Sequence, residues 1–260
     1  MNPVNFGDPM GERLILNPTD KRVIKFFEYL TRLSDDQITM DENGEVFITK
    51  EQKGKRKFST MLLRLLIASK KTATVYSYDQ LPEAGFNVIL SNGKIKNFKP
   101  QNINLNSALS LDIRRASNGL GSDSIVNITR ISDDDSVFLD TKTGKTIDNG
   151  IERPLFILSH ELIHALHHMY GVMIPNKFIG KRKYLRSKEP NIARIEEFVT
   201  VGLLDGLQID GEEGKNIKDV MVDFLRPLLR SYGINEDIFY EITENAIRRE
   251  QDDRYIRIKY

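Results

Sequence analysis

Apolar positions in the first hundred residues recur with two different periods. Over residues 23–33 they are spaced by three or four residues behind a Pro-Thr-Asp capping sequence, and a similar spacing over 58–69 predicts a second amphipathic helix. Alternating β-branched and aromatic residues predict a strand over 72–78, and Asn-Gly dipeptides predict hairpins over 41–48 and 87–98. This part of the chain is therefore expected to mix helices with short strands.

The second half of the chain starts with turns and continues with longer helical patterns. The turn-rich segment contains one short apolar strand, Ser124–Ile128, and a hairpin around Thr143-Gly144-Lys145. Helices are predicted over about 153–170, 190–205, 216–232 and 236–250, with Gly171 and Gly233 as C-terminal caps. We expect an α+β fold with a small mixed or antiparallel sheet and a mainly helical C-terminal half. Residues 1–100 should form an N-terminal portion of the same compact unit, and residues 101–260 its core.

Composition narrows the possible chemistry. The 38 basic and 37 acidic side chains leave a net charge of +1, which argues against a nucleic-acid partner. The sequence has neither a run of apolar residues long enough for a membrane helix nor the pattern of a secretory signal at its start, so no membrane partner is expected and the chain should be made in a cytosol. The absence of cysteine excludes disulfides, thiolate metal sites and cysteine nucleophiles. Any metal ligands must therefore be histidines and carboxylates.

All four histidines lie within residues 160–168, where they form the pattern H-E-x-x-H. The segment is predicted to be helical independently of this motif, from its apolar stripe and from the lack of glycine or proline before Gly171. His160 and His164, four residues apart, lie on one helix face and can bind one ion, while Glu161 is rotated toward the place of the attacking water and can accept its proton. A core helix without a metal is disfavoured, because burying these polar groups unpaired costs several kcal/mol.

The third ligand is expected to be a carboxylate. An extended motif with a third histidine needs glycine at 167 and histidine at 170, where this chain has His167 and Tyr170. His168 lies about 12 Å from His160 along the helix axis, so both remaining histidines should line the helix flank or support the ligands. In the downstream segment 192–203, an aromatic residue and then a small residue follow Glu197 in the order typical of a ligand helix. This order favours Glu197 as the ligand, with Glu196 as the alternative.

Several of these segments resemble the NleD-like zinc metalloproteases that type III secretion delivers. The resemblance covers about residues 120–260 and rests on the segments 121–126, 160–165, 196–203, 244–250 and 257–260. It implies a zincin-like metalloprotease of the glutamate-zincin type with one Zn²⁺ per chain. Such effectors act in the host cytosol, and the founding type cuts stress-activated mitogen-activated protein kinases of the JNK and p38 type within the activation loop.

These implications define the expected partners and their alternatives. We expect a monomer that meets a secretion chaperone and then a host protein substrate, with a mitogen-activated protein kinase as the expected substrate. One alternative is the same protease class acting on another host target, such as a transcription factor. Another is a non-catalytic binding effector that keeps the zinc helix for structure, and a third is a toxin used between bacteria.

Two further expectations concern transition-state stabilisation and substrate binding. Arg257 and Tyr260 have the Arg-x-x-Tyr spacing with which clostridial-neurotoxin-like proteases stabilise the oxyanion; the alternative is an amphipathic terminal strand with the arginine exposed. An extended substrate should pair with an edge strand, for which Ser124–Ile128 is the candidate. The basic segment Lys177–Lys188 is either a docking surface for an acidic partner or a solvated loop.

Overall fold

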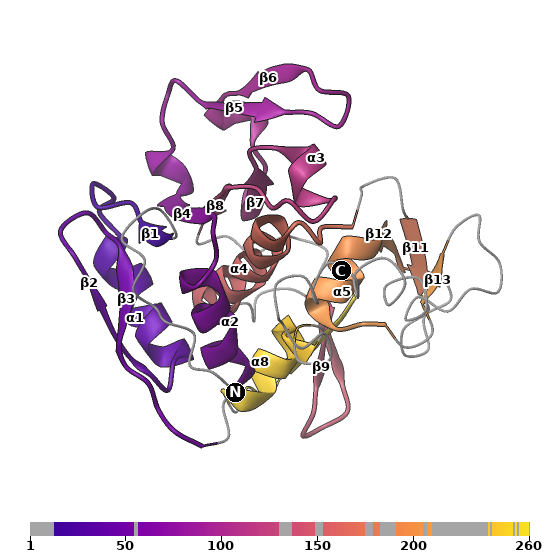
Figure 1. The fold of residues 1–260 in the computed structure, drawn as a ribbon. Helices are drawn as coiled ribbons and strands as arrows, with labels where there is room; N and C mark the ends of the chain where they lie inside the picture. Colours follow the sequence, from indigo (N-terminus) through magenta and orange to yellow (C-terminus); the bar gives the residue numbers. More distant parts are fainter. Residues whose placement is uncertain are drawn as a thin grey trace.

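The computed structural model describes residues 13–54, 57–129, 137–148, 153–174, 179–182, 191–204, 207–209, 239, 241–251, 253 and 255–259. Its centre is a four-stranded mixed sheet in the order β1-β4-β8-β7, packed against one long helix, α4 (Pro154–Tyr170) (Figure 1). Strands β1 (Arg13–Leu16), β4 (Thr72–Ser77) and β8 (Ser124–Ile128) are parallel, and β7 (Ser107–Ser110) runs antiparallel to β8. The expected small mixed sheet is therefore present.

The other elements of the first half surround this sheet. They are α1 (Val23–Leu33), β2 (Gln37–Met40), β3 (Val46–Lys50), α2 (Phe58–Ile67), η1 (Tyr78–Gln80), β5 (Phe86–Ile89), β6 (Ile95–Phe98), η2 (Pro100–Asn102) and α3 (Ile113–Ala116). Both hairpins predicted from Asn-Gly dipeptides are confirmed. Helix α1 begins at Val23, and the carboxylate of Asp20 accepts hydrogen bonds from Arg22 N just before it and from Ser77 at the end of β4.

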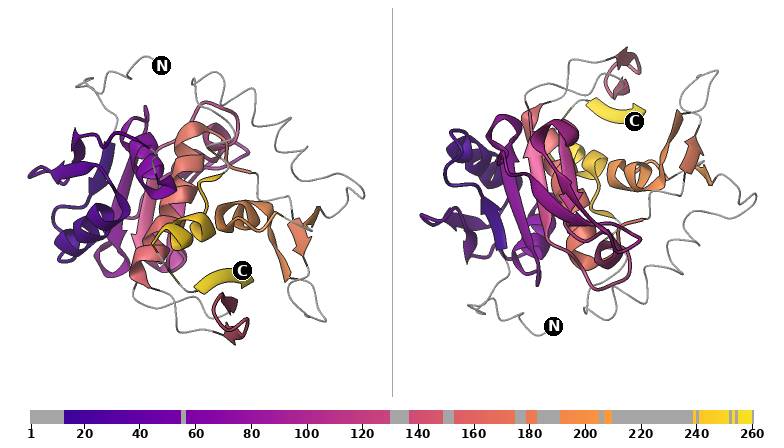
Figure 2. Two further views of the ribbon diagram at one scale, coloured as in Figure 1. Left: turned by 90° about the horizontal axis from the view of Figure 1, so that it is seen from below. Right: turned by 90° about the horizontal axis from the view of Figure 1, so that it is seen from above.

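Strands and helices alternate in the second half. One antiparallel sheet contains β10 (Thr146–Asp148), β9 (Val137–Asp140) and β14 (Tyr255–Lys259), and another contains β12 (Asn191–Arg194), β11 (Ile179–Arg182) and β13 (Gln208–Ile209). Two short helices, α5 (Ile195–Val201) and α8 (Glu244–Glu250), lie beside α4 (Figure 2). The helix predicted from residue 190 starts only at 195, because residues 191–194 pair with β11. The predicted helix 216–232 and Gly233 lie outside the described residues.

Helix α4 forms the middle of the hydrophobic core. Its residues from Leu155 to Tyr170 are all buried, and Leu158, Leu162 and Leu166 belong to the main apolar cluster. It ends where the sequence predicts, at Gly171, whose left-handed φ of 72° a side chain would adopt only with strain. Within the described part of the chain, no helix has the length and apolar character needed to cross a membrane.

The expectation that Ser124–Ile128 is an edge strand is wrong. This strand, β8, pairs with β4 on one side and β7 on the other, and all five of its residues are buried. The run of apolar residues without a charge is typical of a strand covered on both faces. The two edges of the sheet are formed by β1 and β7 instead.

Helix α2 is capped by the distant end of the chain. Its N-cap residue, Lys57, makes no side-chain cap, and the carboxylate of Glu250 accepts hydrogen bonds from Phe58 N (2.5 Å) and Ser59 N (3.1 Å).

We expect Glu250→Gln to lower the free energy of unfolding in urea by about 1 kcal/mol, because an anionic cap on two helix N–H groups is lost. Glu241→Gln, at an exposed position, is the control, and an equal loss in both variants would contradict this role.

Candidate metal centre

His160 and His164 point toward one another from successive turns of α4. Their Nε2 atoms lie 3.1 Å apart, and both side chains are buried. The regular helix produces this arrangement, because residues four apart lie on the same face. The two nitrogen atoms therefore converge on one point at the surface of α4.

The carboxylate of Glu197 meets both imidazoles from α5. Its Oε2 lies 3.0 Å from Nε2 of His164 and 3.6 Å from Nε2 of His160, so that the three possible ligand atoms lie within 4.8 Å of one another. Thr200 lies where α5 packs against α4, with its side chain fully buried and its hydroxyl 3.3 Å from Nδ1 of His164. This is the position at which the sequence indicated a small residue.

Glu196, the alternative ligand, lies on the other side of His164. One carboxylate oxygen is 3.3 Å from Nδ1 of His164 and 2.5 Å from Nδ1 of His167, and the other accepts a hydrogen bond from Ile174 N. His164, His167 and Glu196 thus form a second group of close ligand atoms. A histidine that binds a metal through Nε2 commonly donates its Nδ1–H to a carboxylate, and Glu196 has this position relative to His164.

His160 has a matching carboxylate that the sequence analysis missed. Oε2 of Glu244 lies 2.8 Å from its Nδ1, and the other oxygen of Glu244 accepts from Nε of Arg248 at 2.7 Å. Arg248 in turn donates to Asp253 at 2.8 Å, and all three side chains of this chain of charges have no exposed surface. Glu244 is 84 residues from His160 in the sequence, and a short-range pattern contains no signal for such a pairing.

The electrostatics of this cluster favour a cation. Burial lowers the pKa of His164, but the carboxylates of Glu197 and Glu196 outweigh it and raise that pKa to about 10. Burial likewise acts to lower the pKa of His160, and Glu197 and Glu244 raise it well above its ordinary value. Two imidazole nitrogens and one carboxylate oxygen, without a thiolate, are a donor set that suits Zn²⁺. The residues present therefore fit a zinc ion.

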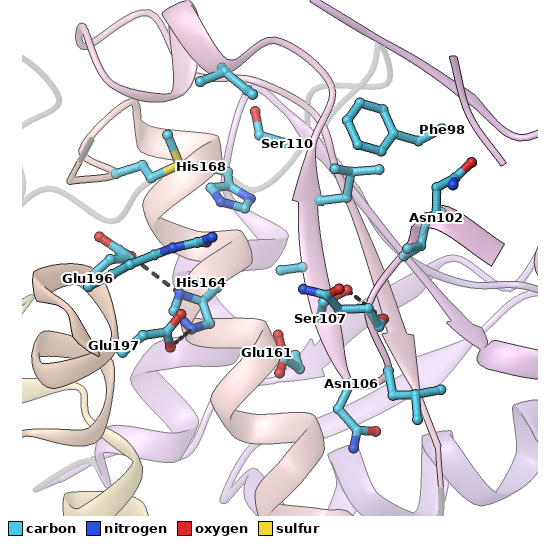
Figure 3. A pocket seen from close by; sticks show the side chains of 18 residues that line it. Phe98, Asn102, Asn106, Ser107, Ser110, Glu161, His164, His168, Glu196 and Glu197 are labelled. Carbon is cyan, nitrogen blue, oxygen red and sulfur yellow. Dashed lines mark hydrogen bonds and ion pairs between the residues drawn. The ribbon is translucent and has the colours of Figure 1, made fainter. Parts of the chain in front are cut away.

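A cleft of about 630 Å³ opens between α4 and the edge strand β7, beside this cluster (Figure 3). Glu161, His164 and Glu197 form part of its wall, and residues 102–110 form the opposite side. The Glu161 side chain projects from α4 toward β7 rather than toward Glu197 (Figure 3). Its carboxylate is therefore placed on the side from which a substrate would approach.

The two expected oxyanion donors have different outcomes. Arg257 lies on β14 with its Nε 3.4 Å from Oε1 of Glu244, and it is not among the described residues that line the cleft. The alternative of a terminal strand is confirmed by β14, but its arginine is not exposed, because Arg257 is buried. Tyr260 lies outside the described residues, as does most of the basic segment 177–188.

Several solved structures resemble the chain weakly. They include the botulinum neurotoxin type D light chain (13% identity, TM-score 0.38), the zinc-free type C light chain (12%, 0.38) and the Clostridium botulinum serotype F light chain (17%, 0.37). The matches cover 96%, 86% and 89% of this chain but only 64%, 64% and 56% of the respective light chains, so the chain spans less than two thirds of each. No curated protein matches the chain at a significant level.

The family comparison covers most of the chain. The sequence profile of the Peptidase_M91 family, described as an effector protein, matches residues 34–260. The match includes the segments that resemble NleD-like proteases and extends well before them, which confirms that resemblance. The chain belongs to the Peptidase_M91 effector family.

Proposed function

We propose that this effector is a zinc-dependent endopeptidase that cleaves a host protein. The observation that carries the proposal is the convergence of His160, His164 and Glu197 on one point in the wall of a cleft that also contains Glu161. In this proposal the three convergent residues hold one Zn²⁺ per chain. Glu196 and Glu244 orient the two imidazoles through their Nδ1 atoms.

The chemistry divides between the metal and Glu161. When bound, zinc polarises the scissile carbonyl and lowers the pKa of water in the site. Glu161 accepts a proton from the attacking water and passes it to the leaving amine nitrogen. Arg257 acts through Glu244 and helps to fix the position of His160. Tyr260 is the proposed donor to the oxyanion.

Tyr260→Phe should lower kcat more than it raises KM, because a donor to the oxyanion acts mainly in the transition state. An unchanged kcat would remove the tyrosine from the mechanism.

An extended substrate would bind at the free edge of β7. Leu111 N donates to Asp123 O, and the register places Ser110 opposite Ser124. Hydrogen-bonded and non-hydrogen-bonded pairs alternate along an antiparallel ladder, so the backbone N–H and C=O groups of Ala108 and Ser110 point away from β8. They are therefore available for pairing with a substrate strand.

The proposed substrate is a mitogen-activated protein kinase of the JNK or p38 type, reached in the host cytosol through type III secretion. The support is membership of the NleD-like effector family. We propose that the chain acts as a monomer after release from a secretion chaperone.

Incubation of the purified chain with purified JNK and p38 should produce fragments that start within the activation loop. If both kinases stay intact while another host protein is cut, the protease class stands and this target is wrong.

The role of Glu244 predicts an effect on metal affinity. We expect Glu244→Gln to weaken zinc binding by about 10- to 100-fold, because His160 loses the anionic partner at its Nδ1. Competition with a chromophoric chelator measures this affinity in the folded protein. Asp253→Asn is the matched control, since it removes the other carboxylate of Arg248 without touching His160. Equal losses of affinity in the two variants would mean that the buried charges serve stability alone.

A further inference from the structure

The cleft contains a polar pair that the proposed mechanism does not use. Ser110 and His168 both line it, although only 4% and 5% of their surfaces are exposed. His168 lies one turn of α4 beyond His164, and Figure 3 shows its ring beside Ser110 at one end of the cleft. Buried polar groups normally have hydrogen-bond partners, so the hydrogen bonds of Ser110 and His168 decide which of their atoms remain for a ligand.

The sheet explains why these side chains meet. Ser110 of β7 stands opposite Ser124 of β8. Val126, two residues along β8, packs in the main core with α4, so Ser124 points to the α4 side of the sheet. Directly opposite residues share a face, and Ser110 therefore points to α4 as well. The two serines lie under the helix turn that contains His168.

Hydrogen bonding within this group leaves two atoms for a ligand. The hydroxyl of Ser124 lies 3.0 Å from Nδ1 of His168, and it has no other partner among the described residues. If Ser124 donates its proton to Nδ1, Nε2 of His168 carries an N–H that water or a ligand in the cleft can accept. The opposite direction would leave the hydroxyl proton of Ser124 unpaired in the protein interior, where this residue is only 1% exposed. The hydroxyl of Ser110 is buried without a hydrogen-bond partner in the part of the chain that the structure describes.

We propose that Ser110 and His168 form a side-chain subsite that selects a neutral hydrogen-bonding residue of the substrate, with a hydroxyl or a carboxamide. This inference rests on the proposed peptidase function and adds its specificity. Nε2–H of His168 donates, and the hydroxyl of Ser110 donates or accepts, which matches a serine, threonine, asparagine or glutamine side chain. An apolar side chain would leave both groups unpaired, and sites of this kind discriminate strongly against such residues.

The surroundings explain the preference for a neutral group. Met173 and Ile113 contribute apolar surface to the same cleft, which disfavours an ionised substrate side chain. Arg194 is the one lysine or arginine among the described lining residues, and three carboxylates oppose its charge. The carboxylates of Glu161, Glu196 and Glu197 in the cleft wall add repulsion against an acidic residue. A cationic residue would face the N–H of His168.

The edge strand also fixes which substrate residue enters the subsite. The backbone groups of Ser110 point to the free edge of β7, where a substrate strand would pair. The residue opposite Ser110 in that added strand has its side chain on the same face of the sheet as Ser110. Selection should therefore fall on a single substrate position.

A peptide library with random sequences tests the subsite. The full chain, loaded with zinc, is incubated with the library, and the products are sequenced by mass spectrometry. We expect the wild type to select serine, threonine, asparagine or glutamine at one position by roughly 10- to 100-fold over isosteric apolar residues. Ser110→Ala should reduce this selection at that position alone, with unchanged zinc content and unchanged selection elsewhere.

Two further variants keep the test decisive. His168→Asn should change the same position as Ser110→Ala, and Ser117→Ala, outside the described cleft lining, should change nothing. If the wild type cleaves peptides without polar selection, or if Ser110→Ala keeps the wild-type selection, the subsite is overturned. If the zinc-loaded wild type cleaves no peptide at all, the proposed function fails and the subsite fails with it.

Discussion

Glu197→Gln should lose the metal ion under conditions in which Glu196→Gln retains it. The two residues are neighbours in the first turn of α5, and both are in contact with His164. Glu197 has its carboxylate at the point where Nε2 of His160 and of His164 converge, so its substitution removes the anionic ligand itself. Glu196 contacts Nδ1 of His164, on the opposite side of the imidazole ring.

The magnitudes of the two effects separate a ligand from an orienting partner. Glu196→Gln should weaken zinc binding by about 10- to 100-fold, as loss of a carboxylate behind a ligand histidine does, and Glu197→Gln should weaken it by clearly more. Zinc content after dialysis and chelator competition on the folded variants measure both. The reverse order would make Glu196 the ligand and would assign the ion to the group of His164, His167 and Glu196.

Glu161→Gln should leave the metal in place and remove most of the activity. Glutamine has almost the same shape as glutamate but cannot accept the proton of the attacking water. Acid–base catalysis by one positioned side chain contributes about 10²- to 10⁴-fold, and kcat/KM should fall by that factor with zinc content unchanged. Measurement of zinc content on the same samples as the rates separates this loss from a loss of metal.

The same variant distinguishes an enzyme from a binding effector. If the zinc helix serves only for structure, Glu161→Gln has no effect on events in the host cell. Normal cleavage by Glu161→Gln at full zinc content would contradict the role of Glu161 as the proton acceptor. Glu28→Gln, on α1 and away from the cleft, controls for the effect of the substitution itself.

The elements with strong local signals could be predicted from the sequence. Helix α4 has an uninterrupted apolar pattern and a glycine cap, so the sequence placed its ends and its H-E-x-x-H face correctly. The order of residue types after Glu197, an aromatic residue and then a small one, favours this glutamate as the carboxylate near both imidazoles. Both signals are local, because they depend on residues within one or two helix turns.

Features that depend on distant parts of the chain could not be predicted. Residues 191–194 have a helical pattern, but they form a strand, β12, that pairs with β11. The apolar strand β8 gave no sign that β7, a short strand with two serines, would cover its outer edge. Glu244 reaches His160 only because α8 packs against α4, which no spacing rule near the motif reveals.

The most direct test of the central claim is the appearance of new N-termini in a host-cell lysate. The zinc-loaded wild-type chain and Glu161→Gln are incubated with the lysate, and protein N-termini are mapped by mass spectrometry. A zinc endopeptidase with Glu161 as its proton acceptor predicts a small set of new N-termini that arise with the wild type and are absent with the variant. Identical sets of N-termini in the two samples would contradict it.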